Sequence, residues 1–199
     1  MNLFLQGQFG SGKSSLLRKA LEPFSSSLAG FSTQRLKKND KTIGYRALTI
    51  TETLPPLEAI YTPGERGMFI RIPNRQIDIS VLEKTILQAE QDALRPGCKL
   101  ILLDEIGGIE LKSEVFMGSL LRLLYGAKPC IGVLKSASSL SHTLSQLSLD
   151  QDYLSRHDHL EQIIRRKGEL ILVTPQNREA LPGYLSRSLS AMLSSESLR

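Results

Sequence analysis

Gly7-Gln8-Phe9-Gly10-Ser11-Gly12-Lys13-Ser14 is the stretch that decides the fold of this sequence. It matches the phosphate-binding loop pattern G-x-x-x-x-G-K-[S/T], the Walker A motif, at every fixed position. The apolar run Leu3-Phe4-Leu5 before it predicts a strand, and residues 15–21 after it are good helix formers that end before Pro23. In such a strand–loop–helix unit, backbone N–H groups turn inward and the helix N-terminus adds the positive end of its dipole. The stretch therefore predicts a binding site for a nucleotide polyphosphate.

Two side chains of this loop have specific expected roles. Lys13 is expected to bridge the β- and γ-phosphate oxygens, and the Ser14 hydroxyl is expected to bind Mg²⁺. Lys13 is also a candidate catalytic residue, because it neutralises charge on the group that is transferred. The other six residues are expected to surround the phosphates: Gly7, Gln8, Phe9, Gly10, Ser11 and Gly12.

The composition indicates a globular protein in a reducing compartment. A chain of 199 residues with 41% apolar residues is long enough to bury a sizeable core. Cys98 and Cys130 lie far apart without C-x-x-C spacing, which indicates buried free thiols and not a disulfide framework. No segment reaches the length of a membrane span and no signal peptide is visible, so we expect a cytoplasmic protein without a membrane partner.

The net charge of +5 carries little information about partners. Basic residues cluster within residues 35–41 and 165–167, but no aromatic stripe accompanies them and the chain has no tryptophan. These features do not favour nucleic acid as a partner. Solvated surfaces and attraction for a polyanionic nucleotide account for the charges more simply.

Strand and helix patterns alternate along most of the chain, which predicts an α/β fold with a mostly parallel central sheet flanked by helices. After the phosphate loop unit, Ser80-Val81-Leu82-Glu83 has the capping-box pattern and predicts the start of a helix that ends near Arg95. The expected strands that follow are residues 100–103, 130–134 and 170–173, and the expected helices are residues 113–125, 157–167 and a segment after 177.

Two parts of the chain depart from this alternation. Residues 30–75 predict an antiparallel excursion made of two pairs of extended segments, 30–36 with 43–50 and 57–61 with 68–72. Residues 136–155 are rich in serine and predict a surface insertion, partly helical or mobile, for which a lid over the nucleotide is the second interpretation. We expect one domain over residues 1–190 and a tail over residues 191–199.

A second motif supplies two acidic side chains. The apolar run Leu100–Leu103 ends in Asp104-Glu105, at the C-terminal end of an expected central strand, where open α/β sheets bind ligands. Beside a phosphate loop, this pattern is typical of a Walker B segment. Asp104 is expected to hold Mg²⁺, directly or through a water, and Glu105 is expected to orient or deprotonate the water that attacks the γ-phosphate.

The segment Leu103–Ser113 resembles the D-E-I-G-x-M-E-L-x-S signature of the small cancer-related nucleoside-triphosphatase family. Three other segments resemble family segments in the same order, so the resemblance covers residues 1 to about 185. These segments are Gly30-Phe31-Ser32-Thr33 (family G-F-Y-T), Ile43-Gly44-Tyr45 (family I-G-F) and residues 177–182 (family N-R-x-x-L-P).

The resemblance implies a P-loop NTPase fold and Mg²⁺-dependent hydrolysis of ATP, GTP and other nucleoside triphosphates to diphosphate and phosphate. It also implies that Gly7–Ser14 and the segment Asp104, Glu105, Ile106 and Gly107 contact the nucleotide. The sequence departs from the family at Gln34, where glutamate is common, and at Ile109, where methionine is usual. The serine-rich stretch is also longer than the family pattern.

Two other functions stay open from the sequence. A nucleotide or small-molecule kinase would use the same loop with an acceptor hydroxyl in place of water. A nucleotide-gated binding protein with slow hydrolysis would contact a protein or RNA partner through the serine-rich stretch or the basic clusters, and that partner is unknown. Lys135 follows an expected strand, where a polar residue could sense the γ-phosphate, but an exposed strand-end lysine is the more common explanation. Glu110 is interpreted as a solvated, helix-start or supporting acid. Hydrolysis often recruits an arginine, and the sequence does not rank the candidates Arg66, Arg71, Arg75, Arg165 and Arg166.

Overall fold

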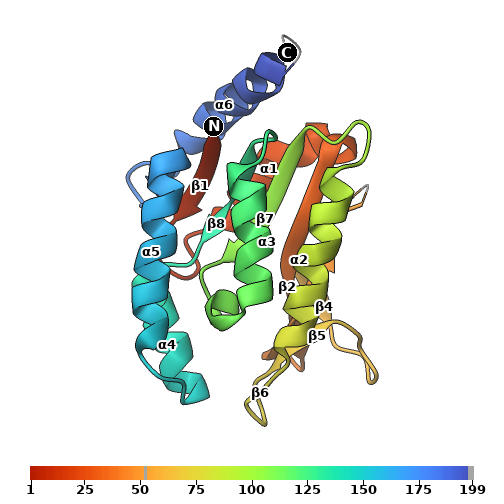
Figure 1. The fold of residues 1–199 in the computed structure, drawn as a ribbon. Helices are drawn as coiled ribbons and strands as arrows, with labels where there is room; N and C mark the ends of the chain where they lie inside the picture. The colour runs from red at the N-terminus through yellow and green to blue at the C-terminus, as the bar shows by residue number, and fades with distance from the viewer. Residues whose placement is uncertain (52, 197–199) are drawn as a thin grey trace.

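The structure, a computed structural model, describes residues 1–51 and 53–196. Within these residues, nine strands form one sheet in the order β6-β5-β3-β2-β7-β8-β1-β9, and β4 pairs with β2 outside this path (Figure 1). The strands are β1 (Asn2–Gln6), β2 (Leu28–Lys38), β3 (Lys41–Thr49), β4 (Glu58–Ile60), β5 (Met68–Arg71), β6 (Gln76–Ile77), β7 (Leu100–Ile106), β8 (Cys130–Leu134) and β9 (Gly168–Leu172). The α-helices are α1 (Lys13–Leu21), α2 (Ile79–Ala93), α3 (Glu114–Tyr125), α4 (Ala137–Leu147), α5 (Asp152–Lys167) and α6 (Leu181–Glu196), and the 3-10 helices are η1 (Glu22–Ser27) and η2 (Ile109–Lys112).

The centre of the sheet is parallel. β2, β7, β8, β1 and β9 pair in parallel in this order. β3, β5 and β6 extend the sheet with antiparallel pairs. Figure 1 shows α2, α3 and α5 in front of the sheet and α1 behind it. This arrangement confirms the α/β fold with flanking helices and an antiparallel excursion that the sequence predicts.

Both faces of the parallel strands are buried. In β7, Ile101 and Leu103 belong to one apolar core, which they share with α2, α3 and α5. Leu100 and Leu102 belong to a second core, which they share with α1 and α6. Alternate side chains on opposite faces both need apolar partners, which explains the uninterrupted apolar run of this strand. Asp104 therefore follows a strand that is packed from both sides.

The segment expected at residues 57–61 pairs differently from the prediction. β4 lies parallel to β2, with Glu58 opposite Arg35, and it does not pair with β5. On β2, the pairing with β7 ends at residue 32. The same edge of β2 is therefore free at residues 35–37, where β4 pairs. β5 pairs with β3 and β6. The expected hairpin of residues 30–36 with 43–50 is confirmed by the antiparallel pair of β2 and β3.

The N-terminus of α2 is capped two residues before the expected capping box. Asp78 is the N-cap, and its Oδ1 accepts hydrogen bonds from Ser80 N at 3.1 Å and Ser80 Oγ at 2.7 Å. Glu83 accepts a hydrogen bond from Ser113 Oγ at 2.6 Å, which links α2 to the start of α3. The capping-box interpretation is wrong, because the carboxylate of Asp78 already satisfies this helix end.

The serine-rich segment is mostly helical. It forms α4 and the first residues of α5, which begins at Asp152 and not at residue 157. Leu140 and Leu144 of α4 are fully buried, so the segment packs against the core. Ser136 is the N-cap of α4, and its Oγ accepts a hydrogen bond from Ser139 N at 3.3 Å. Part of the serine content therefore serves helix capping.

At the C-terminal end, α6 runs to Glu196 and includes residues 191–196 of the segment expected as a tail, while residues 197–199 lie outside the described chain. Cys98 and Cys130 are buried free thiols, as the composition indicated. Among the described helices, none has both the length and the apolar character needed to cross a membrane.

Candidate active site

Two glycines in the left-handed region shape the phosphate loop between β1 and α1. Gly10 has a φ of 77° and Gly12 a φ of 83°, values that residues with a side chain rarely adopt. Gly12 is the N-cap of α1, and its carbonyl accepts a hydrogen bond from Leu16 N at 2.9 Å. Ser11 N donates to Gln8 O at 3.2 Å, which closes the turn. The loop thus curls around the N-terminus of α1.

Lys13 places its ammonium group inside this loop. Its Nζ donates to the carbonyl oxygens of Gly7 at 3.0 Å and Gln8 at 2.8 Å, and to Ser11 Oγ at 3.4 Å. Burial lowers the pKa of Lys13 from its usual value, and the charge of Glu105 opposes this shift. The ammonium group is therefore held by neutral oxygens, which the charged oxygens of a phosphate group can replace with stronger hydrogen bonds.

The antiparallel excursion reaches this loop through a cation–π contact. The side chain of Phe9 is 73% exposed. The guanidinium of Arg35, on β2, lies 5.1 Å from the centroid of the Phe9 ring. The outer end of β2 therefore contacts the phosphate loop, in addition to its role in the sheet.

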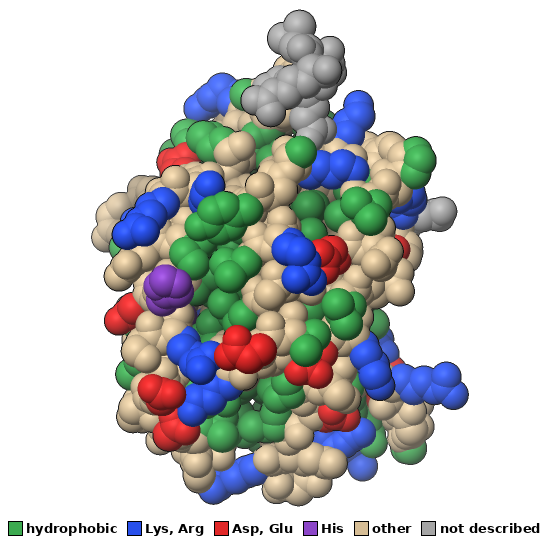
Figure 2. Space-filling model, in the orientation of Figure 1, with side chains coloured by type: hydrophobic (Ala, Val, Ile, Leu, Met, Phe, Trp, Pro, Cys, Tyr) green, Lys and Arg blue, Asp and Glu red, His purple; other side chains and the backbone are tan. Residues whose placement is uncertain are grey.

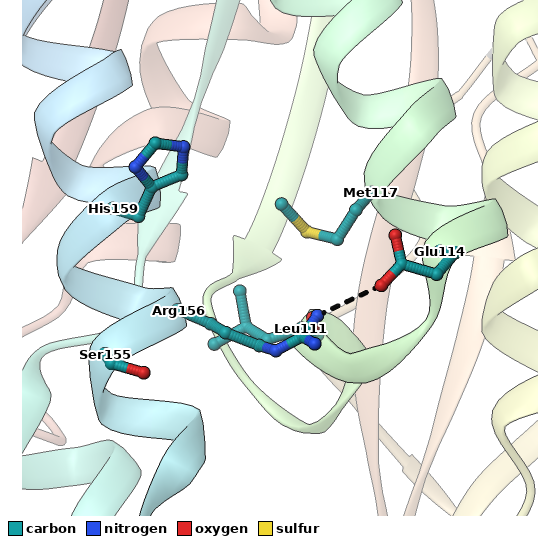
Figure 3. A pocket seen from close by; sticks show the side chains of 6 residues that line it. All are labelled: Leu111, Glu114, Met117, Ser155, Arg156 and His159. Carbon is teal, nitrogen blue, oxygen red and sulfur yellow. Dashed lines mark hydrogen bonds and ion pairs between the residues drawn. The ribbon is translucent and has the colours of Figure 1, made fainter.

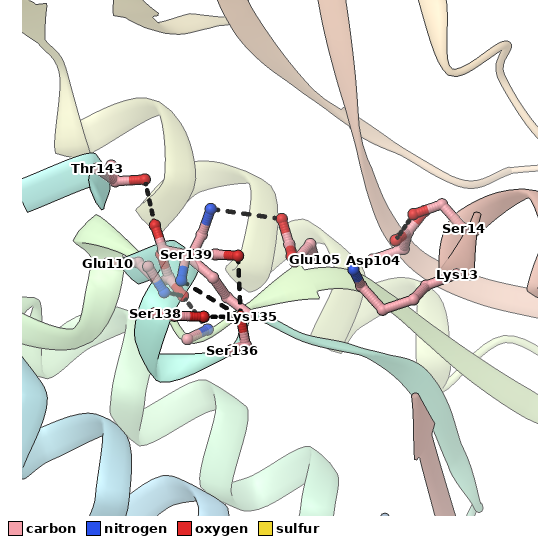
Figure 4. A network of polar contacts seen from close by, with 12 residues as sticks. Lys13, Ser14, Asp104, Glu105, Glu110, Lys135, Ser136, Ser138, Ser139 and Thr143 are labelled. Atoms are coloured by element: carbon pink, nitrogen blue, oxygen red, sulfur yellow. Dashed lines mark hydrogen bonds and ion pairs between the residues drawn. The ribbon is translucent and has the colours of Figure 1, made fainter. Parts of the chain in front are cut away.

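Ser14 and Asp104 bring two oxygen ligands together. Ser14 Oγ donates to Asp104 Oδ1 at 2.7 Å (Figure 4). Asp104 is only 2% exposed. Burial raises the pKa of its carboxyl to about 6, and the charge of Glu105 adds to the shift, whereas the hydrogen bond from Ser14 opposes it. A buried carboxylate gains most from a nearby cation, so this position is suited to a divalent metal ion.

The donor set fits Mg²⁺. A hydroxyl and a carboxylate are hard oxygen ligands, and Mg²⁺ in nucleotide sites usually takes one or two carboxylates together with phosphates and water. In the part of the chain that the structure describes, no group of three or more His, Cys, Asp or Glu side chains is arranged to hold a metal. In a nucleotide site of this kind, Ser14 and Asp104 would supply two oxygen ligands, and phosphates and water would supply the others.

Glu105 faces Lys135 at the end of β8. Lys135 Nζ lies 3.5 Å from Glu105 Oε2, and the two side chains are 22% and 30% exposed (Figure 4). Both charges act on Lys13, because Glu105 raises the pKa of Lys13 and Lys135 lowers it. Lys135 N donates to Ile106 O at 2.8 Å, which fixes the backbone at this point. The interpretation of Lys135 as an exposed strand-end lysine is wrong, since it is half-buried and paired with Glu105.

The turn that follows Glu105 is closed by Glu110. Its Oε1 accepts hydrogen bonds from Gly107 N at 2.6 Å and Gly108 N at 2.8 Å. Glu110 is 5% exposed, and burial raises the pKa of its carboxyl. Gly107 has a φ of 88°, and a Cβ there would lie 2.8 Å from Leu134 Cδ1. Glu110 is therefore a buried acid that holds the turn, and not a solvated one.

Gln34 uses both ends of its amide within the protein. It is 1% exposed; its Nε2 donates to Pro56 O at 2.6 Å and its Oε1 accepts from Arg46 Nε at 2.6 Å. A glutamate would keep the bond from Arg46 and lose the bond to Pro56. This departure from the family pattern therefore serves the packing of the excursion.

Arg18 is a functional candidate that the sequence analysis missed. Its Nη2 donates to Ser32 Oγ at 2.7 Å, and Ser32 lies opposite Asp104 in the pair of β2 and β7. Burial lowers the pKa of Arg18, and the charge of Asp104 opposes this. Arg18 follows Ser14 by four residues, so the two share a face of α1, and this spacing was the available signal.

Two of the arginines considered for transition-state stabilisation are engaged elsewhere. Arg165 pairs with Glu161 on α5 at 2.8 Å. Arg75 donates to Ser148 Oγ at 2.9 Å. Neither of these contacts involves the phosphate loop or the segment Asp104–Gly107.

A groove lies between η2, α3 and α5 on the face seen in Figure 1, where hydrophobic side chains run between α5 and α3 (Figure 2). Arg156 Nη1 donates to Leu111 O and to Glu114 Oε1, both at 3.2 Å. The lining residues are Leu111, Glu114, Met117, Ser155, Arg156 and His159 (Figure 3). None of them belongs to the phosphate loop or to the segment Asp104–Gly107, so the groove is separate from the candidate site.

Comparisons with known proteins give matches that cover most of the chain. A protein-family model described as NTPase matches residues 2–185. The chain is 27% identical over 197 residues to Nucleoside-triphosphatase THEP1 of Methanosarcina barkeri (strain Fusaro / DSM 804), which covers 96% of this chain and 99% of that protein. It is 31% identical over 125 residues to the human Cancer-related nucleoside-triphosphatase, which covers 58% of this chain and 65% of that protein.

A solved structure has the same fold. The crystal structure of THEP1 from the hyperthermophile Aquifex aeolicus superposes with a TM-score of 0.60 at 20% sequence identity, over 93% of this chain and 96% of that chain. At this level of identity the similarity supports the arrangement of strands and helices. The chemistry of the site depends on the residues described above.

Proposed function

Since this chain belongs to the nucleoside-triphosphatase family, we propose that it hydrolyses ATP, GTP and other nucleoside triphosphates to diphosphate and phosphate in a Mg²⁺-dependent reaction. Family membership makes it an enzyme that acts on nucleoside triphosphates. The dependence on Mg²⁺, the range of bases and the roles of individual residues are the proposed part.

One observation carries the proposal. The hydrogen bond of 2.7 Å between Ser14 and Asp104 joins the phosphate loop to the end of β7, and Glu105 follows on the same strand end. The side chains that we propose as metal ligands and as the base therefore lie close to the loop that holds Lys13. Phosphoryl transfer requires mainly positioning and charge stabilisation, and these side chains supply both.

In the proposed reaction, Lys13 neutralises the charge of the β- and γ-phosphate oxygens. Glu105 accepts a hydrogen bond from the attacking water and takes its proton as the oxygen bonds to the γ-phosphorus. The bond from the γ-phosphorus to the β–γ bridging oxygen breaks, and the electron pair leaves with the nucleoside diphosphate. When bound by Ser14 and Asp104, Mg²⁺ would supply charge neutralisation for these phosphate oxygens. Lys135 holds the Glu105 carboxylate at the mouth of the loop.

The other parts of the proposal rest on coarser observations. The contacts assigned above are to phosphate and metal and not to the base, so we expect hydrolysis of nucleoside triphosphates with different bases. The two buried free thiols support a cytoplasmic location. In the described residues all strands join one sheet, which supports a single domain over residues 1–190.

The proposal is tested by phosphate release from ATP, GTP, CTP and UTP without any acceptor, with Mg²⁺ or with a chelator. We expect turnover of all four only with Mg²⁺, and a loss of at least about a hundredfold in Lys13→Ala. Lys19→Ala is the matched control, because Lys19 is an exposed lysine on the same helix. Its activity is expected to equal that of the wild type.

Two outcomes would contradict the proposal. Tight nucleotide binding without phosphate release would favour a kinase that needs an acceptor, or a nucleotide-gated binding protein. Equal activity in Lys13→Ala and Lys19→Ala would show that the hydrolysis does not use this loop.

A further inference from the structure

The segment that follows β9 lies against the phosphate loop. β9 pairs in parallel with β1, so the chain leaves both strands at the same edge of the sheet. Val173 N continues this pairing by donating to Gln6 O at 2.7 Å. A Cβ on Gly7 would lie 2.8 Å from Val173 O, so the two backbones touch where the phosphate loop begins.

Asn177 holds this segment in one shape. Its Oδ1 accepts from Thr174 N at 2.9 Å, and its Nδ2 donates to Leu172 O at 2.8 Å. Its carbonyl accepts from Leu181 N at 3.2 Å, at the start of α6. Arg178 N donates to Thr174 O at 3.1 Å. The backbone of Arg178 is therefore fixed on both sides by a local network of hydrogen bonds.

The guanidinium of Arg178 lies over Gly12. A Cβ placed on Gly12 would be 2.9 Å from Arg178 Nη2, 3.3 Å from its Cζ and 3.5 Å from its Nε. Three atoms of the guanidinium thus face the same backbone position. A residue with a side chain would not fit at position 12, because φ is 83° and because the Arg178 guanidinium occupies the space of a Cβ.

The charges around Arg178 leave it without a counter-ion. Arg178 is exposed, and within the described part of the chain its side chain makes no hydrogen bond or ion pair. The first turn of α1, which begins beside Gly12, contains no acidic residue that could pair with this arginine. Because Gly12 is the N-cap of α1, the positive end of the helix dipole opposes an unpaired cation at this position. The arrangement becomes favourable when a polyphosphate occupies the loop.

We propose that Arg178 binds the α- and β-phosphates of the nucleotide, as a clamp on the side of the loop opposite Glu105. This inference rests on the proposed function, which places the γ-phosphate beside Glu105 at the end of β7. β9 lies on the other side of β1 from β7 and β8. The phosphates that remain in the diphosphate therefore face Arg178, and substrate and product share this contact.

Loss of the Arg178 side chain should weaken nucleotide binding and leave the catalytic step nearly unchanged. A contact made equally to triphosphate and diphosphate raises KM when it is lost and leaves kcat nearly unchanged. We expect the Kd of ADP and of UDP to rise by the same factor in Arg178→Ala, about tenfold to a hundredfold, because a charge-assisted hydrogen bond is lost. Inorganic pyrophosphate should lose affinity by a similar factor, since the contact does not involve the base.

The experiment is calorimetric titration of ADP, UDP and pyrophosphate into the full chain with Mg²⁺, for wild type, Arg178→Ala, Arg178→Gln and Arg178→Lys. Arg178→Lys is expected to recover part of the affinity and Arg178→Gln to recover none, because charge and not packing makes the contact. Arg187→Ala removes an exposed arginine of α6 and is the matched control.

Three results would overturn the proposal. Unchanged affinities in Arg178→Ala would show that Arg178 does not contact the nucleotide. A loss for ADP with no loss for pyrophosphate would show stacking on the base and not a phosphate contact. Full recovery in Arg178→Gln would show that Arg178 only supports Gly12. These titrations need no turnover. A wild type that binds ADP but releases no phosphate from ATP would therefore contradict the proposed hydrolysis and leave the proposed contact of Arg178 intact.

Discussion

Replacing Asp104 by asparagine should stabilise the metal-free protein at neutral pH. Burial raises the pKa of the Asp104 carboxyl from the reference value of 3.8 to about 6. The folded protein therefore holds this proton more tightly than the unfolded chain does. Between about pH 4 and pH 6 the unfolded chain binds fewer protons, so the free energy of unfolding decreases as the pH rises.

The size of this effect follows from the pKa shift. A difference of about two pKa units corresponds to about 3 kcal/mol in the free energy of unfolding. The wild type loses this whole amount only above pH 6. Asparagine carries no charge and keeps an oxygen that accepts the hydrogen bond from Ser14. We therefore expect the free energy of unfolding of Asp104→Asn to exceed that of the wild type by about 2–3 kcal/mol at pH 7.5 and to equal it near pH 4.

The measurement is urea unfolding at both pH values in the presence of a chelator. Asp40→Asn is the control, because Asp40 lies in an exposed turn at a positive φ that asparagine also tolerates. Added Mg²⁺ and nucleotide should stabilise the wild type more than Asp104→Asn, because the variant keeps the phosphate loop and loses the metal-binding carboxylate. A variant that is no more stable than the wild type at pH 7.5, or a gain in stability that persists at pH 4, would show that the buried charge of Asp104 does not destabilise the metal-free protein.

Three further changes have clear expected results. Lys135→Met should lower kcat by at least about tenfold and change the free energy of unfolding by less than about 1 kcal/mol, because the pair with Glu105 is partly exposed; an unchanged kcat would contradict its role. Gly30→Ala should cost more than about 3 kcal/mol or prevent folding, since a Cβ there would lie 1.9 Å from Leu102 O. Gly118→Ala should instead stabilise α3 by about 0.5–1 kcal/mol, because only Arg122 lies near its Cβ position and alanine favours helix. Urea unfolding of both glycine variants tests this contrast, and a destabilised Gly118→Ala would contradict it.

The local part of the site was predictable because short motifs encode it. The phosphate loop and the strand that ends in Asp104 each depend on contiguous residues, and the structure joins Ser14 to Asp104 at 2.7 Å. The strand Cys130–Leu134 was also predicted at its observed bounds, since its five residues are all buried. A continuous apolar run of this length leaves few alternatives.

The parts that were missed depend on contacts between distant residues. The pairing of β4 with β2 depends on where β7 stops, which no local pattern records. Lys135 is ordinary in the sequence, and only the neighbouring strands β7 and β8 bring it to Glu105. Arg178 likewise reaches Gly12 because β9 lies beside β1. Local sequence patterns predict single helices and strands, whereas the order of the strands in the sheet decides which distant side chains meet at the candidate site.

The proposed role of Glu105 in activating the attacking water is tested by Glu105→Gln, which keeps the size of the side chain and removes its charge. Phosphate release at saturating Mg²⁺ and GTP would be measured with nucleotide affinity in parallel, and Glu114→Gln, an exposed acid of α3, is the control. If Glu105 takes the proton of this water, the turnover of Glu105→Gln falls at least about a hundredfold while its nucleotide affinity changes by less than about threefold. Turnover of Glu105→Gln at the rate of the wild type would show that Glu105 is not the base.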